Sequence, residues 1–95
     1  MAYRVSLTPT ADRELADLPQ HVQKRVVRWL ELIGREPRRK GTTKLKGRDD
    51  LRRVHASRDY VVLYRVDDSS EEVLVARIAH RSEAYRRLPV KPKRT

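Results

Sequence analysis

Alternating arginine and histidine side chains in the second half of the chain have a type and spacing that could support chemistry. Arg53 and His55 are two residues apart, and Arg77, Ala79 and Arg81 repeat this spacing. Because successive residues of a strand point to opposite faces of a sheet, each set would project from one side. A sheet face that carries guanidinium and imidazole groups suits a phosphate-rich substrate and acid–base chemistry. The pattern therefore suggests a nuclease as well as a basic protein.

Cleavage of RNA without a metal needs three kinds of group. A base takes the 2′-hydroxyl proton, cations hold the charged phosphorane, and an acid protonates the leaving 5′-oxygen. His55 can act as base or acid near neutral pH. Arg53 and Arg81 can bind phosphate through paired hydrogen bonds. Tyr85 could stack on a base or donate a proton. These four residues are the catalytic candidates, and we expect neither a metal nor another cofactor.

Further basic residues are candidates for supporting roles. Residues 38–48 form either a solvated loop or a region that contacts backbone phosphates. His55 could equally be a half-exposed strand histidine, and His80 is more simply explained by a structural role. The supporting candidates are Arg65, Arg77 and His80, and the candidates for RNA binding are Lys44, Lys46, Arg48 and Arg52.

The net charge of +10 is distributed unevenly along the chain. Residues 1–37 carry six Lys or Arg against five Asp or Glu, whereas residues 38–65 carry ten against three. A positive field on one half of a small domain attracts polyanions, most commonly nucleic acid. The chain has no cysteine, which excludes disulfides and thiolate metal sites. Apolar runs such as residues 61–63 are too short to span a membrane, so we expect a soluble cytoplasmic protein.

The first elements predicted are a short strand and a helix. Alternation over residues 3–7 indicates a strand with one buried face. Thr8 is placed to cap a helix and Pro9 to occupy its first position, where a missing N–H costs nothing. This helix should extend to about Leu18.

A second helix is predicted to begin at Pro19. Gly34 is expected to end it as a left-handed C-cap, and Pro37 prevents its continuation. Its apolar side chains recur at helical spacing, at Val22, Val26, Leu30 and Ile33.

Three strands are expected after a polar loop over residues 38–50. They cover Leu51–Ser57, Tyr60–Asp67 and Glu72–His80, and their short connections require an antiparallel meander. Residues 82–87 could add a short helical turn. The fold class is therefore α+β, in the order β-α-α-β-β-β, with a two-helix hairpin on one face of a largely antiparallel sheet and the other face free for function. We expect one domain over residues 1–88 and a mobile basic tail over 89–95.

The parity of each strand predicts which side chains face the helices. In the middle strand both faces are apolar, and the charge of Arg65 decides that its set points away. The side chains expected to face the helices are Val54, Ala56, Tyr60, Val62, Tyr64, Val66, Leu74, Ala76 and Ile78. Those expected on the opposite face are Arg53, His55, Ser57, Val61, Leu63, Arg65, Val73, Val75, Arg77, Ala79 and Arg81.

Several sequence patterns together resemble a known family. They are Tyr-Arg-Val-x-Leu-Thr-Pro-x-Ala (3–11), Leu-Pro (18–19), Lys-Leu-Lys-Gly (44–47), Leu-Arg-Arg-Val (51–54), Asp-Tyr (59–60), Leu-Tyr (63–64) and the ending His-Arg-Ser-Glu-Ala-Tyr (80–85). With these patterns the chain resembles the RelE branch of the RelE/ParE superfamily of bacterial toxins from type II toxin–antitoxin systems. The resemblance covers residues 3–87, and the ending is its most specific part.

The resemblance implies a ribosome-dependent endoribonuclease that enters the A site, next to 16S rRNA, and cuts mRNA without a metal. It also implies a RelB-like antitoxin that wraps and silences the toxin. Arg53 and His55 match two basic positions of the family, and Arg81 and Tyr85 match its phosphate-holding arginine and C-terminal tyrosine. Because lysines are usual at the first two positions, the identity of the general base stays open.

One position departs from the family pattern. An arginine usually follows the tyrosine that corresponds to Tyr60, and here Val61 stands in its place. Either Arg65 or Arg77 substitutes from the same face, or the activity is reduced or altered. The departure leaves room for two alternatives, which are a ParE-like toxin that poisons DNA gyrase by binding and a plain RNA-binding module.

Overall fold

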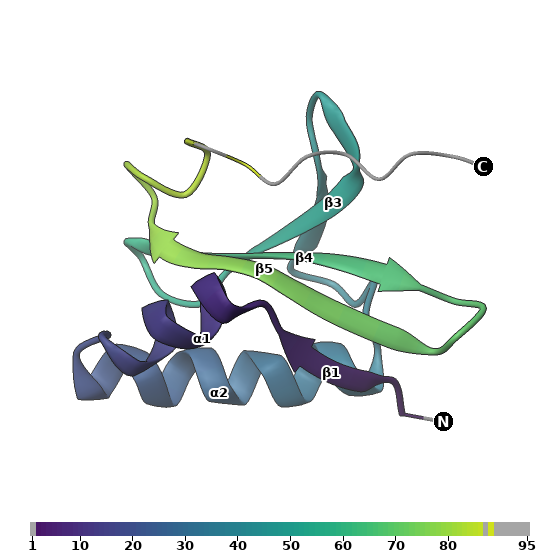
Figure 1. Ribbon diagram of the computed structural model, residues 1–95, viewed down its shortest axis with the longest axis horizontal. Helices are drawn as coiled ribbons and strands as arrows, with labels where there is room; N and C mark the ends of the chain where they lie inside the picture. Colours follow the sequence, from purple (N-terminus) through teal and green to yellow (C-terminus); the bar gives the residue numbers. More distant parts are fainter. Residues whose placement is uncertain (1, 87, 89–95) are drawn as a thin grey trace.

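The computed structural model describes residues 2–86 and 88 and shows two helices packed on one face of a five-stranded sheet (Figure 1). The strand order is β1-β5-β4-β3-β2, in which β1 is parallel to β5 and the other pairs are antiparallel. The predicted α+β class and helix placement are therefore confirmed. The elements are β1 (Arg4–Leu7), α1 (Pro9–Ala16), α2 (Gln20–Arg35), β2 (Thr42–Leu45), β3 (Arg48–His55), β4 (Tyr60–Asp67) and β5 (Glu72–His80).

The start of α1 follows the sequence prediction. The Thr8 hydroxyl accepts a hydrogen bond from the backbone N–H of Ala11 at 3.1 Å, and Pro9 occupies the first turn. This cap satisfies one of the N–H groups that a helix start leaves unpaired. The helix ends at Ala16, two residues before the predicted Leu18.

The predicted role of Gly34 was wrong. Gly34 lies inside α2 and is not among the glycines with positive φ; the helix ends one residue later, with Glu36 as its C-cap. A Cβ at this position would lie 3.0 Å from Cγ2 of Val5, and the Gly34 carbonyl accepts the N–H of Tyr3. The glycine therefore allows α2 and the N-terminal strand to approach closely.

The segment predicted as a loop, residues 38–50, contains a strand. β2 pairs antiparallel with β3, which begins at Arg48 rather than at the predicted Leu51. Gly47 has a φ of +85°, which suits the tight connection between them. Because the segment has no regular alternation of apolar residues, its hydrophobic pattern did not reveal the strand.

The chain leaves β5 into a turn rather than a helix. Residues 81–86, called the C-terminal turn below, are held locally by the N–H groups of Glu83 and Ala84, which both donate to the His80 carbonyl. These i→i+3 and i→i+4 bonds make a single helical turn, as predicted within 82–87, which does not continue into a helix in the described residues. Residue 87 and the predicted tail, residues 89–95, lie outside the described residues.

The larger apolar cluster lies between the helices and the sheet. Tyr64 is fully buried there, and its hydroxyl donates to the Pro37 carbonyl at 2.6 Å. Predicted parity was confirmed for Val54, Ala56, Val62, Tyr64 and Ile78, which join Ala11, Val22, Val26 and Ile33 in this cluster. No helix in the described part of the chain is long and apolar enough to cross a membrane.

A β-bulge in β5 changed the predicted parity of that strand. Leu63 pairs with Arg77 and Tyr64 with Val75, so Ala76 is an extra residue without a partner on β4. Val73 and Val75 consequently pack toward the helices, and Ala76 packs on the opposite side. The three predictions for these side chains were wrong because an extra residue inverts the alternation on one side of it.

The face opposite the helices was predicted to be free, but it carries a second apolar cluster. The C-terminal turn covers this cluster, and its residue Ala84 is fully buried there. The members are Leu45, Leu51, Val61, Leu63, Ala76, Ala79 and Ala84, with Leu88 packed against them. Exposed polar side chains on this face therefore lie at the edge of the second cluster.

Candidate active site

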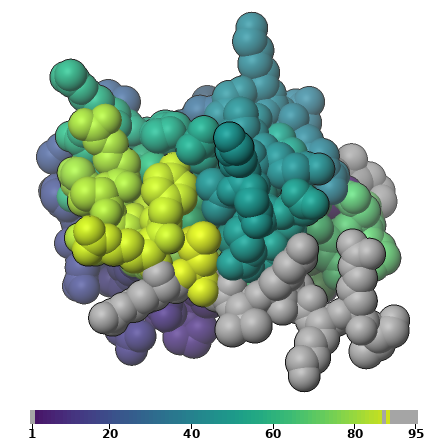
Figure 2. Space-filling view, turned by 90° about the horizontal axis from the view of Figure 1, so that it is seen from above, coloured from purple at the N-terminus to yellow at the C-terminus, as the bar shows by residue number. Residues whose placement is uncertain are grey.

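A hydrogen bond joins two of the predicted catalytic residues, Arg53 and Tyr85, at the edge of the second cluster. The Arg53 Nη1 donates to the Tyr85 hydroxyl at 3.0 Å, and its Nε donates to the Thr43 hydroxyl at 3.2 Å. Residues 32 apart in the sequence thereby share one site, called the Arg53–Tyr85 site below. Figure 2 shows how this happens, because the C-terminal turn (yellow) lies against β3 (teal) on the face seen from above.

Two rigid elements and one turn position these groups. Thr43 is the register partner of Arg53 on β2, and Leu63 is its partner on β4, so Arg53 stands on a paired strand. Tyr85 follows Ala84, which is anchored in the second cluster, and keeps 38% of its own surface exposed. The phenol is thus fixed at its base and open to solvent at its tip.

His55 lies on the same face as Arg53, two residues further along β3. Its register partner on β4 is Val61, whose side chain is fully buried in the second cluster. The imidazole itself is exposed and makes no hydrogen bond or ion pair among the described residues. It is therefore accessible to a ligand that lies over the Arg53–Tyr85 site.

Arg81 and His80 follow at the end of β5. The Arg81 N–H donates to the Asp59 carbonyl at 2.7 Å, while its side chain is 61% exposed and 3.7 Å from the Asp59 carboxylate. The His80 ring packs edge-on to Tyr60 at 5.5 Å, and its Nδ1 is 2.9 Å from the Ser82 hydroxyl. Arg81 thus presents an exposed cation on a backbone that is held by Asp59, whereas the His80 ring contacts Tyr60 and Ser82.

Arg65 and Arg77, predicted as supporting residues, do not lie in the Arg53–Tyr85 site. The Arg65 Nε is 3.2 Å from the Asp50 carboxylate, and the Arg77 Nη2 is 2.8 Å from the Glu14 carboxylate. Both arginine side chains are half-buried or more. The expectation that one of them replaces an arginine at position 61 stays a prediction.

The residues predicted to bind RNA divide into two pairs. Lys44 and Lys46 are exposed on and beside β2. Arg48 instead forms two hydrogen bonds with the Asp50 carboxylate at 2.9 Å, and Arg52 donates to both the carbonyl and the hydroxyl of Thr42. Only the two lysines present charges that are not committed to the fold.

The ion pairs around Asp50 have an electrostatic consequence. Hydrogen bonds from Arg48, and then from Arg65, lower the pKa of the Asp50 carboxyl from 3.8 to about 2. Asp50 and Arg65 line a cavity of about 470 Å³ that also borders Arg38 and Asp68. Two of its guanidinium groups are paired with carboxylates, Arg38 with Asp68 and Arg65 with Asp50, which reduces the positive charge of this cavity. A polyanion has less reason to bind here than at the Arg53–Tyr85 site.

Thr43 was not identified from the sequence. It accepts the Arg53 Nε and so fixes the direction of the guanidinium group. The signal that could have found it is the pair of β-branched residues Thr42 and Thr43, which favours a strand beside β3. No group of three or more His, Asp or Glu that could hold a metal ion occurs among residues 2–86 and 88.

The chain matches known sequences over most of its length. The family described as "ParE toxin of type II toxin-antitoxin system, parDE" matches residues 5–85. Toxin RelE of Mycobacterium tuberculosis is 36% identical over 95 residues, covering 96% of this chain and 94% of that protein. Toxin RelG of the same organism is 37% identical over 91 residues, covering 92% of this chain and all of that protein.

Solved structures show the same fold. The RelBE2 toxin–antitoxin complex of Mycobacterium tuberculosis contains a chain that superposes with a TM-score of 0.74 at 30% identity, covering 85% of this chain and all of that one. A chain of the intact RelBE complex of E. coli gives a TM-score of 0.74 at 25% identity, covering 83% and 96%.

The fold and the matched residues define a toxin of a type II toxin–antitoxin system, and the chain belongs to the ParE toxin family. Within the wider RelE/ParE superfamily it is a RelE-branch toxin, since the relatives named here are RelE and RelG. The resemblance that the sequence patterns indicated is confirmed.

Proposed function

We propose that this toxin is a ribosome-dependent endoribonuclease that cuts mRNA in the A site by attack of the 2′-hydroxyl. The observation that supports this most is the hydrogen bond between Arg53 and Tyr85 beside an open imidazole. Metal-independent RNA cleavage requires a base, an acid and a cation, which an imidazole, a phenol and a guanidinium group can supply.

Each group has a role that follows from its contacts. The Tyr85 oxygen accepts from Arg53, so the phenolic O–H remains available to donate. The Arg53 Nη2 makes no contact among the described residues and can bind a phosphate oxygen. His55 takes the 2′-hydroxyl proton, the 2′-oxygen bonds to phosphorus, and Tyr85 protonates the 5′-oxygen that leaves. The products are a 2′,3′-cyclic phosphate and a free 5′-hydroxyl.

Arg81 supplies the second cation. Its backbone is fixed to Asp59, and its exposed guanidinium can move toward the phosphorane. Val61 has an apolar side chain, which is fully buried in the second cluster, so this position supplies no charge. We infer that Arg53 and Arg81 share the charge stabilisation that the family places on an additional arginine. Lys44 and Lys46 contact backbone phosphates of the mRNA or of 16S rRNA.

A RelB-like antitoxin is the proposed protein partner. The solved chains with this fold include RelE–RelB complexes, such as the one from E. coli. A net charge of +10 suits a partner segment that is acidic or amphipathic, because long-range attraction accelerates encounter. Such a complex and a ribosomal target both place the protein in the cytoplasm.

The test is a short induction of the chain in bacteria, followed by mapping of new mRNA 5′ ends by primer extension. We expect cuts inside translated codons for the natural sequence. Arg81→Ala should reduce cleavage by about 2–4 kcal/mol of transition-state stabilisation, the usual cost of losing one charge-stabilising donor. Undiminished cutting by this variant, expressed to the same level, would show that Arg81 has no role in the reaction.

Gyrase poisoning is the second candidate, because the matching family is described by the ParE toxin and Val61 replaces a cationic residue. Against it, the helix hairpin is short, with 8 residues in α1 and 16 in α2. Growth arrest with a DNA-damage response and no new mRNA ends would favour this function. If induction causes neither growth arrest nor new mRNA ends, the remaining candidate is an RNA-binding module.

A further inference from the structure

The edge of β5 changes its partner where β1 ends. Leu7 is the last residue of β1 paired with β5, opposite Val75. Beyond it the Thr8 hydroxyl donates to the Ala76 carbonyl at 3.1 Å, and the Glu14 carboxylate accepts the N–H of Ile78 at 2.9 Å. Side chains at the start and middle of α1 therefore complete the edge of the sheet that β1 leaves open.

Arg77 directly follows the bulged residue Ala76, and its side chain reaches this same edge. The Arg77 Nε and Nη2 lie 3.0 and 2.8 Å from the Glu14 carboxylate, and the two side chains are only 16% and 21% exposed. Bulges commonly re-aim a side chain beside a functional site. Glu14 thus binds the backbone of β5 and the side chain of Arg77 at once, which fixes the plane of the guanidinium group.

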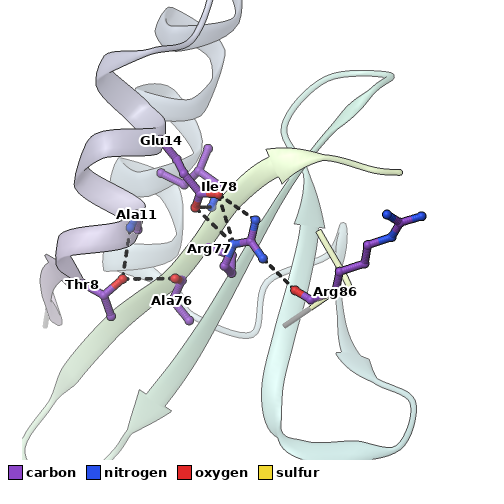
Figure 3. A network of polar contacts seen from close by, with 7 residues as sticks. All are labelled: Thr8, Ala11, Glu14, Ala76, Arg77, Ile78 and Arg86. Carbon is purple, nitrogen blue, oxygen red and sulfur yellow. Dashed lines mark hydrogen bonds and ion pairs between the residues drawn. The ribbon is translucent and has the colours of Figure 1, made fainter. Parts of the chain in front are cut away.

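The third nitrogen of this guanidinium reaches the C-terminal turn. The Arg77 Nη1 donates to the Arg86 carbonyl at 2.7 Å, and Figure 3 shows Arg77 lying between Glu14 and Arg86. The backbone bonds of the turn after Arg81, whose N–H donates to the Asp59 carbonyl, are local, from Glu83 and Ala84 to the His80 carbonyl and from Arg86 to the Glu83 carbonyl. The His80 Nδ1 also accepts the Ser82 N–H, so among the described residues Arg77 is the one side chain from outside residues 80–86 that binds the backbone of this turn.

Tyr85 is the residue directly before Arg86. Its hydroxyl meets Arg53 on one side of the turn, and Arg77 holds the carbonyl of the next residue on the other. We propose that Arg77, oriented by Glu14, is a positioning residue that holds the C-terminal turn so that the Tyr85 hydroxyl stays on Arg53. Its importance for cleavage rests on the proposed function, whereas its effect on the turn does not.

The first test measures the turn itself by NMR on the full-length chain in its free form. In Arg77→Lys, which keeps the charge but loses the fork, we expect exchange of the Ala84 and Arg86 amides to rise about tenfold or more. The Tyr85 ring ¹³Cζ shift should move toward its value in Arg53→Lys. Amides in the middle of β4 should keep their protection.

Two further variants keep this test decisive. Glu14→Gln retains an acceptor for Ile78 and removes the charge that orients Arg77, so it should loosen the turn in the same direction but less. Asp50→Asn is the matched control, because it breaks a half-buried carboxylate–arginine cluster that does not touch the turn. An unchanged Tyr85 shift and unchanged turn protection in folded Arg77→Lys or Glu14→Gln would overturn the proposal.

The second test asks whether the position of Tyr85 carries the catalytic effect. Single-turnover cleavage on programmed ribosomes should be about 10- to 100-fold slower for Arg77→Lys, with little change in the toxin concentration that gives half-maximal rate. Combining Arg77→Lys with Tyr85→Phe should cost little more than Tyr85→Phe alone. Multiplicative losses would refute a role through Tyr85. A natural chain that cuts no RNA would refute the proposed function, and the NMR result would still decide whether Arg77 holds the turn.

Discussion

The two faces of the sheet are covered in different ways. On one face two helices bury a cluster that includes the largest fully buried side chains, Tyr64 and Ile33. On the other face valines, leucines and alanines are covered by the C-terminal turn, whose Ala84 enters the cluster. On this second face the burial of Ala84 also fixes the position of Tyr85, because the two residues are adjacent in the chain. The helix face stabilises the fold, and the turn face links a small core to the candidate chemistry.

The largest expected effect tests the helix face. Ile33→Ala should lower the free energy of unfolding by about 2–5 kcal/mol, because Ile33 is fully buried and its removal leaves a cavity. Urea denaturation measures this loss. Val27→Ala is the matched control on the same helix, since Val27 is 44% exposed, and it should change stability by about 0.5 kcal/mol or less. Equal losses for the two variants would contradict the assignment of the core.

The next effect separates neighbouring arginines on opposite faces of β3. Arg53→Ala should slow cleavage by about 2–4 kcal/mol, or roughly 30- to 900-fold, with little loss of stability. Arg52→Ala should do the reverse, because Arg52 bonds to Thr42 and its loss should cost about 1 kcal/mol of stability. Single-turnover cleavage and urea denaturation of both variants provide the comparison. Equal slowing of cleavage by the two variants would contradict the different roles assigned to Arg53 and Arg52.

The smallest effect concerns pH and the cluster around Asp50. Since its folded-state pKa is lowered from 3.8 to about 2, chiefly by Arg48 and then Arg65, the ionised Asp50 stabilises the fold above about pH 4. That contribution, on the order of 1 kcal/mol after screening by solvent, is lost as pH falls toward 2. Unfolding free energies of the natural chain and Asp50→Asn should differ at pH 7 and converge near pH 2. A difference that persists at pH 2 would assign it to packing instead.

Most of the fold could be predicted from local sequence signals. Thr8 and Pro9 marked the start of α1, and the alternation of β4 gave its bounds as observed. The errors arose where a tertiary contact decides. Gly34 is a close approach between two elements, and a residue's sequence neighbours do not reveal which strand passes beside it. The strand β2 lacks an apolar alternation because Leu45 is its only member in the second cluster.

The residue types of the candidate site could be predicted from the sequence, but most of their hydrogen-bond and ion-pair partners could not. Arg53 and His55 follow from strand parity, but the meeting of Arg53 with Tyr85 depends on how a turn folds back over the sheet. Arg77 keeps the predicted parity, as the register partner of Leu63, but its guanidinium group bonds to Glu14 and to the Arg86 carbonyl instead of joining Arg53. Ion pairs over long sequence distances, such as Glu14 with Arg77, leave no periodic signal in the sequence.

The most direct test of the account is cleavage of a defined mRNA by the purified chain on ribosomes stalled with a known codon in the A site. The account predicts a cut within that codon, a 2′,3′-cyclic phosphate on the upstream product, no requirement for added divalent metal beyond what the ribosome itself needs, and a rate that falls about 30- to 900-fold in Arg53→Ala. Intact mRNA with the natural chain, or equal cutting by Arg53→Ala, would contradict it.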